Sequence, residues 1–189
     1  SAFDTVKYPW ELLDDKIGDC DDLATLYSTL LNNIGIETMW LDVFKPGEGH
    51  VFLMFDSGVK PDDVDRLFLD RTEVAIVDNK VWIPVEATLV GKPFFSAWKQ
   101  GALKYTQMKN DQFINEISMT KAMAKYLPGS ITPEEVYIPD PTGVSDLLEE
   151  DIRQYIKWLD QVVAKGIEGK LETADDYYDV AVLYMEFGR

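Results

Sequence analysis

The sequence has very few of the residues that form disulfides or bind transition metals. Among its 189 residues there is one cysteine, Cys20, and one histidine, His50. A single cysteine excludes an internal disulfide, and one cysteine with one histidine is too small a ligand set for a zinc site. Aspartates cluster at 14–15, 19–22 and 62–65, but their spacing does not fit the D-x-D-x-D-G calcium loop and favours a solvated surface. We therefore expect neither a metal nor another cofactor.

Positive charge and long apolar runs are also scarce. The chain has 18 Lys and Arg against 34 Asp and Glu, a net charge of −16 that would repel a phosphate backbone, so no nucleic-acid partner is expected. No run approaches the roughly 20 apolar residues of a transmembrane helix. No basic, apolar signal region opens the chain, yet Ser1 and Ala2 resemble a cut end. A removed signal or anchor thus stays open, and an extracytoplasmic location is slightly favoured.

What the sequence does have is enough hydrophobic residues, 46%, for a packed core. Apolar positions at helical spacing predict a helix over 20–33. Four short apolar runs then predict two antiparallel hairpins, with strands at 37–44, 50–55, 73–78 and 80–85. These patterns predict a helix followed by an antiparallel sheet in the first hundred residues.

The second half of the chain has a different pattern. Beyond Pro93 it predicts helices and no strand, then an irregular connector at 128–145 that is rich in Pro, Gly, Ser and Thr. An amphipathic helix is predicted at 146–167. The tail at 174–189 resembles the first helix of a tetratricopeptide repeat. We expect a domain over residues 1–130 and a helical extension over 131–189, which could lead into such repeats and contact protein partners.

Cys20 stands where the predicted helix begins, and this position favours chemistry as its role. A helix start presents unpaired backbone N–H groups and the positive end of the helix dipole, and both stabilise the thiolate that attacks electrophiles. Asp19, Asp21 and Asp22 oppose this charge, so the thiol would need a base from elsewhere in the chain. The competing interpretation, an inert and buried small side chain, is the ordinary one for a lone cysteine and stays open.

His50 is the one histidine that could serve as this base. It opens the strand predicted at 50–55, and a helix start packed on that strand can bring a nucleophile and a base together. Glu86 follows the next predicted hairpin, where its carboxylate could accept the proton on the ring nitrogen that does not face sulfur. A lone histidine or glutamate is more commonly a surface or structural residue, so the triad is a hypothesis.

Three segments occur in the order GDCDDLATLYSTLLNNIGIETMWLDV, GHVFLMF and VWIPVEATL. In order and spacing they resemble the core of the transglutaminase-like superfamily, relatives of the papain-type cysteine proteases, over roughly residues 8–105. The resemblance implies an α+β, papain-like fold in which the cysteine-bearing helix packs on an antiparallel sheet. It also implies Cys20 as the nucleophile, His50 as the general base and Glu86 as the acid that orients the imidazole.

The resemblance is incomplete at two points. The family more often has aspartate at the position of Glu86, although Trp82 matches the aromatic residue before that acid; Asp56 and Asp78 are weaker substitutes for it. The oxyanion site is the second point, because the Cys20 N–H would supply one donor and no Asn or Gln precedes it. The upstream candidates for a second donor are the side chains of Trp10 and Tyr8.

The function expected from these residues is thiol-dependent acyl transfer on a peptide or protein substrate. An acyl-enzyme on Cys20 would pass to water in a protease or amidase, and to an amine in a transglutaminase. The sequence does not choose between these acceptors. The alternative is a catalytically inactive peptide-binding or scaffolding module of the same fold.

Overall fold

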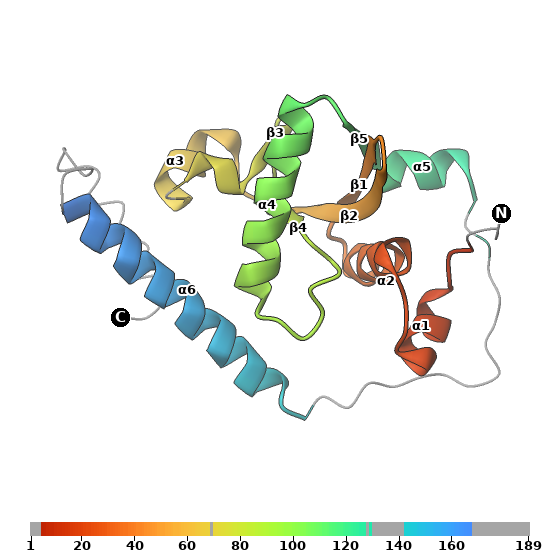
Figure 1. Ribbon diagram of the computed structural model, residues 1–189, viewed down its shortest axis with the longest axis horizontal. Helices are drawn as coiled ribbons and strands as arrows, with labels where there is room; N and C mark the ends of the chain where they lie inside the picture. Colours follow the sequence, from red (N-terminus) through yellow and green to blue (C-terminus); the bar gives the residue numbers. More distant parts are fainter. Residues whose placement is uncertain (1–4, 69, 128, 130–141, 168–189) are drawn as a thin grey trace.

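The computed structural model describes residues 5–68, 70–127, 129 and 142–167, and it shows a mixed α/β architecture around a curled antiparallel sheet (Figure 1). Two helices precede the sheet and the rest are interspersed with or follow its strands. The elements are α1 (Pro9–Asp15), α2 (Cys20–Asn33), β1 (Thr38–Lys45), β2 (Glu48–Asp56), η1 (Pro61–Asp63), α3 (Val64–Leu67), η2 (Arg71–Glu73), β3 (Ala75–Val77), β4 (Lys80–Val85), α4 (Phe94–Asn110), β5 (Ile114–Ser118), α5 (Met119–Lys125) and α6 (Val144–Ile167).

Both predicted hairpins are confirmed, and turn residues explain their register. Pro46 and Gly47 connect β1 to β2, with Gly47 at a φ of +80°, as the third position of a type II turn requires. Asp78 and Asn79 connect β3 to β4, and their φ values of 50° and 58° are those of a type I′ turn. The sheet order is β3-β4-β2-β1-β5, so β2, which carries His50, lies at its centre.

The strand β5 corrects the expectation that no strand follows Pro93. It pairs antiparallel with β1, from Met39 opposite Ser118 to Val43 opposite Ile114. Five residues between two helices give a weak periodic signal, and β5 forms because β1 would otherwise leave its outer backbone groups unpaired. The sequence also did not predict the two-turn helix α1, which is too short for a clear helical period.

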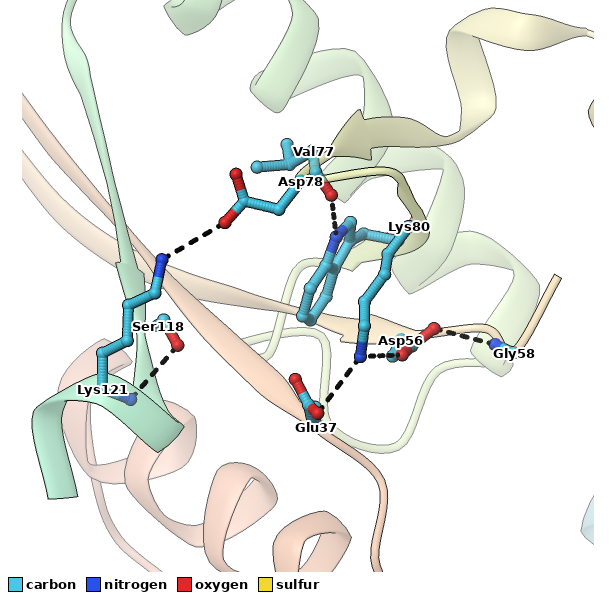
Figure 2. Close-up of polar contacts among 9 residues, drawn as sticks. Glu37, Asp56, Gly58, Val77, Asp78, Lys80, Ser118 and Lys121 are labelled. Atoms are coloured by element: carbon cyan, nitrogen blue, oxygen red, sulfur yellow. Dashed lines mark hydrogen bonds and ion pairs between the residues drawn. The ribbon is translucent and has the colours of Figure 1, made fainter. Parts of the chain in front are cut away.

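The sheet curls so strongly that its two ends approach each other (Figure 2). Asp78, in the β3–β4 turn at one end, accepts from the ammonium of Lys121, in α5 just after β5 at the other end, at 3.2 Å. Lys80 of β4 lies between two carboxylates, 2.8 Å from Asp56 and 3.1 Å from Glu37. The Asp78–Lys121 pair is largely exposed, so it marks the curvature and adds little stability.

The concave face of the sheet holds the main hydrophobic core. Its buried side chains come from β1, β2, β3, β4 and α4, and they are Met39, Leu41, Val43, Phe52, Met54, Ala75, Trp82, Tyr105 and Met108. The helix α4 lies directly against β4 at Gly101, where an added Cβ would come within 2.7 Å of the backbone of Pro84 and Val85. This contact needs a residue without a side chain.

The predicted helix at 146–167 is present as α6, which lies beside α4 (Figure 1). Aromatic side chains make part of this contact. The rings of Tyr155 and Trp158 lie 5.5 and 5.3 Å from that of Phe95, and the Lys99 ammonium lies 3.9 Å from the Trp158 ring centre. The predicted repeat-like segment at 174–189 and most of the predicted connector fall outside the described residues. Among the helices that the structure describes, none is both long and apolar enough to span a bilayer.

Candidate functional site

The helix α2 begins at Cys20, as the sequence predicts, and its first turn is fixed by a buried carboxylate. Asp22 is only 6% exposed, and its two oxygens accept from the backbone N–H groups of Lys7, at 2.6 Å, and Asp19, at 3.2 Å. These bonds connect the N-terminal segment to the helix start. Within the described residues, the N–H of Cys20 itself makes no hydrogen bond, so it can donate to a ligand.

Gly18 allows α1 to pack closely beside this helix start. A Cβ at Gly18 would lie 2.3 Å from Leu12 Cδ1 and 3.0 Å from the Asp22 side chain. Leu12 is buried in the contact between α1 and α2. The glycine two residues before the cysteine therefore determines how the chain enters α2.

His50 and Glu86 are brought together by the fold. His50 Nε2 lies 2.8 Å from Glu86 Oε2, and the two side chains are 15% and 7% exposed. His50 comes from β2, and Glu86 follows the last residue of β4, which pairs with β2 from Leu53 to Asp56. The imidazole is also stacked on Phe52, with ring centres 5.8 Å apart and planes inclined by 22°. The ring is thus held by a carboxylate and by an aromatic face.

Thr88 holds the other oxygen of Glu86, a role that the sequence analysis did not assign. Its hydroxyl and its backbone N–H both donate to Glu86 Oε1, at 2.7 and 3.2 Å. Burial raises the pKa of Glu86, but the hydrogen bonds from His50 and Thr88 outweigh burial, so the net pKa lies below its ordinary value. The carboxylate is therefore ionised at neutral pH. A threonine two residues after an acid is a local bonding pattern that could have indicated this contact.

The thiol and the imidazole are not joined directly. In the part of the chain that the structure describes, no hydrogen bond connects Cys20 to His50, and the imidazole Nδ1 has no partner. The helix α2 covers the face of the sheet that carries Trp40, whose indole N–H donates to Ser28 at 2.9 Å. The regular register places His50 on the opposite face, with Phe52. However, β4 pairs with β2 only from Leu53 to Asp56. The edge of β2 that faces β4 therefore has no strand partner at His50.

The three aromatic side chains that the sequence analysis singled out near the proposed site are Trp82, Trp10 and Tyr8, and their N–H or O–H donors have different surroundings. The indole N–H of Trp82 donates to the carbonyl of Val77 at 3.1 Å, inside the core, so it is committed to the β3–β4 hairpin. Trp10, in α1, has a buried Nε1 with no partner among the described residues. Tyr8 precedes α1, and its hydroxyl lies beside Gly129. Trp10 is therefore the candidate with a buried donor that has no partner among the described residues.

The weaker alternatives to Glu86 have other partners (Figure 2). Asp56 accepts from Lys80 and from the N–H of Gly58, and Asp78 accepts from Lys121. The carboxylate bound to the imidazole is that of Glu86. Asp19, Asp21 and Asp22 have oxygens within 4.8 Å of one another, but Asp22 is already engaged by backbone donors, and the cluster is explained by the helix start.

Comparison with known proteins gives no family for this chain. No protein-family model, no curated protein and no solved structure matches it. The functional argument therefore depends on the site itself.

Proposed function

We propose that this protein catalyses thiol-dependent acyl transfer on a peptide or carboxamide substrate, with Cys20 as the nucleophile, His50 as the base and Glu86 as the orienting acid, on a papain-like core. The observation that carries the proposal is the 2.8 Å contact between His50 Nε2 and Glu86 Oε2. A carboxylate on Nε2 fixes the ring and leaves Nδ1 as the proton acceptor. A helix that begins with the sole cysteine packs on the strand that carries this ring, although it covers the face opposite to His50, so the thiol would have to reach the imidazole past the edge of β2 that has no β4 partner at His50.

The chemistry follows from these groups in two steps. In the first, the thiol proton passes to His50 Nδ1 and the sulfur bonds to the substrate carbonyl carbon, whose π electrons move to oxygen. When the C–N bond breaks, the leaving nitrogen takes the proton from the imidazolium and a thioester remains on Cys20. In the second step, water or an amine attacks the thioester as His50 accepts its proton. The C–S bond then breaks and returns the thiol, while Glu86 stabilises the imidazolium throughout.

Two donors are available for the oxygen of the tetrahedral intermediate. The backbone N–H of Cys20 lies at the start of α2 and has no partner among the residues that the structure describes. The second candidate is the indole N–H of Trp10, which has no partner in the described part of the chain and lies in α1, which packs against α2. A buried donor without a partner costs free energy, which is consistent with a group kept for a ligand.

The test is a peptide-library reaction followed by mass spectrometry, with and without an added primary amine, on the wild type and on Cys20→Ala. Hydrolysed products that disappear in the variant would identify a protease or amidase. Amine adducts that disappear would identify a transglutaminase. Peptide capture without turnover, with equal binding by Cys20→Ala, would defeat the enzymatic proposal.

A second candidate is a non-catalytic module that binds peptides. The observation that favours it is the lack of a hydrogen bond between Cys20 and His50 within the described residues. Catalytic hydrogen bonds are often long before a substrate is bound, so this geometry is compatible with both candidates. The library reaction separates them.

A further inference from the structure

An apolar cavity of about 630 Å³ lies between α2, the ends of β2 and β4, and the segment that leads into α4. Its volume falls in the range of roughly 300–1,000 Å³ that is typical of ligand sites. Apolar side chains make up most of its wall, and the charged residues on it are Glu86, Lys92 and Asp151. Asp151 comes from α6 and accepts from the N–H of Phe94 at 2.6 Å, so α6 helps to shape the cavity.

Several of the large hydrophobic side chains that face solvent in this structure gather around the cavity. Leu30, Ile34, Val90 and Phe94 line it and are 49, 73, 60 and 43% exposed. Exposed apolar groups that converge on one concavity are typical of a binding site, whereas single exposed hydrophobic residues are ordinary. The cavity is therefore a surface on which burial of a ligand would release water.

The cavity and the candidate nucleophile share one side of α2. Tyr27 lines the cavity and follows Cys20 by seven residues, which is nearly two full turns, so both residues lie on one stripe of the helix. The axial separation between them is about 10 Å at 1.5 Å per residue. Glu86, which contacts His50, is also part of the cavity wall.

We propose that this cavity is the subsite that binds a bulky apolar side chain of the peptide substrate. The inference builds on the proposed function and names its substrate class. An extended peptide advances about 3.3 Å per residue, so a peptide lying along α2 places a side chain about three residues from the attacked carbonyl in the cavity. Peptides with leucine or phenylalanine at that position bind in preference to those with a charged residue there.

The experiment measures binding separately from turnover. Immobilised Cys20→Ala protein is incubated with decapeptide libraries in which one position is fixed as Leu, Phe, Asp or Lys, and retained peptides are counted by mass spectrometry. We expect at least fivefold enrichment of Leu or Phe over Asp and Lys at one position. The bonds that the wild-type protein attacks in the same peptides are then identified. We expect the selected position to lie about three residues from the attacked carbonyl.

Two pairs of substitutions supply the matched comparison. Leu30→Gln with Val90→Gln changes two cavity residues that are 49 and 60% exposed, and it should remove the enrichment. Ile76→Gln with Leu103→Gln changes residues outside this cavity that are 49 and 54% exposed, and it should preserve the enrichment. The substitutions conserve charge, and circular dichroism verifies that each variant is folded.

The outcomes separate this inference from the proposed function. No preference for apolar residues, or a preference that survives the cavity substitutions, would overturn the subsite. Apolar selection by Cys20→Ala protein without any turnover by the wild type would leave a peptide-binding cavity and defeat the catalytic proposal. Turnover by the wild type without apolar selection would support the catalytic proposal and overturn the subsite.

Discussion

The imidazole of His50 and the carboxylate of Glu86 lie 2.8 Å apart, although 36 residues separate them in the sequence. The contact forms because β2 and β4 are neighbours in the sheet and Glu86 follows the last paired residue of β4. Thr88 engages the carboxylate oxygen that the imidazole leaves free. Both oxygens of the carboxylate are thereby held by hydrogen bonds.

Glu86→Gln should reduce Cys20-dependent turnover by about 100-fold or more, because an amide of the same shape cannot stabilise the imidazolium as a carboxylate does. The measurement is kcat/KM on the best peptide from the library reaction. Asp56→Asn is the control, since Asp56 contacts Lys80 and should leave turnover within about twofold. Equal effects of the two substitutions would remove Glu86 from the proposed triad.

The same carboxylate predicts how stability depends on pH. Hydrogen bonds outweigh burial and lower the pKa of Glu86 in the folded chain. A carboxyl group whose pKa is lower in the folded than in the unfolded chain stabilises the fold at pH values above its pKa in the unfolded chain, about 4.3. This stabilisation is lost as the pH falls through the lower pKa of the folded chain. Urea unfolding of wild type and Glu86→Gln between pH 7 and pH 3 should show the wild-type advantage shrinking below about pH 4.3. A constant difference over this range would contradict the assignment.

Trp10→Phe separates a catalytic donor from a packing residue. The substitution keeps an aromatic ring in α1 but removes an N–H that has no partner among the described residues. Stability should therefore change little, whereas turnover should fall by about 10²-fold if the indole donates to the oxyanion. Urea unfolding and kcat measure the two effects. A loss of stability with unchanged kcat would assign Trp10 to packing alone.

Gly101→Ala tests the contact between α4 and β4. The new Cβ would lie 2.7 Å from backbone atoms of Pro84 and Val85, which cannot move aside as a side chain can. We expect a loss of about 1–3 kcal/mol in the free energy of unfolding. Gly49→Ala is the control, because a Cβ there meets nothing within 4 Å. Two substitutions of equal cost would show that α4 is not closely packed at this point.

The sequence predicted the hairpins and α2 because local signals determine them. Pro46–Gly47 and Asp78–Asn79 specify their turns, and α2 has a clear helical period. The strand β5 depends on pairing with β1, a distant partner, so a five-residue segment between helices carried no sufficient local signal.

For the site, motif order predicted that Glu86 would meet His50, and the structure places them in contact. The path of α2 relative to the imidazole could not be predicted in the same way. It depends on which face of the sheet the helix covers and on where β4 stops pairing with β2, and both result from tertiary packing. The coupling between Cys20 and His50 consequently stays a prediction.

The most direct measurement of the central claim is the alkylation rate of Cys20 by iodoacetamide across pH 5–9, in wild type and in His50→Ala. The account predicts that the wild type reacts faster than a free model thiol at neutral pH, and that His50→Ala slows the reaction by about tenfold, because the imidazole takes the thiol proton as the sulfur attacks. A rate equal to that of the model thiol, or one unchanged by His50→Ala, would contradict it and leave Cys20 as an ordinary structural cysteine.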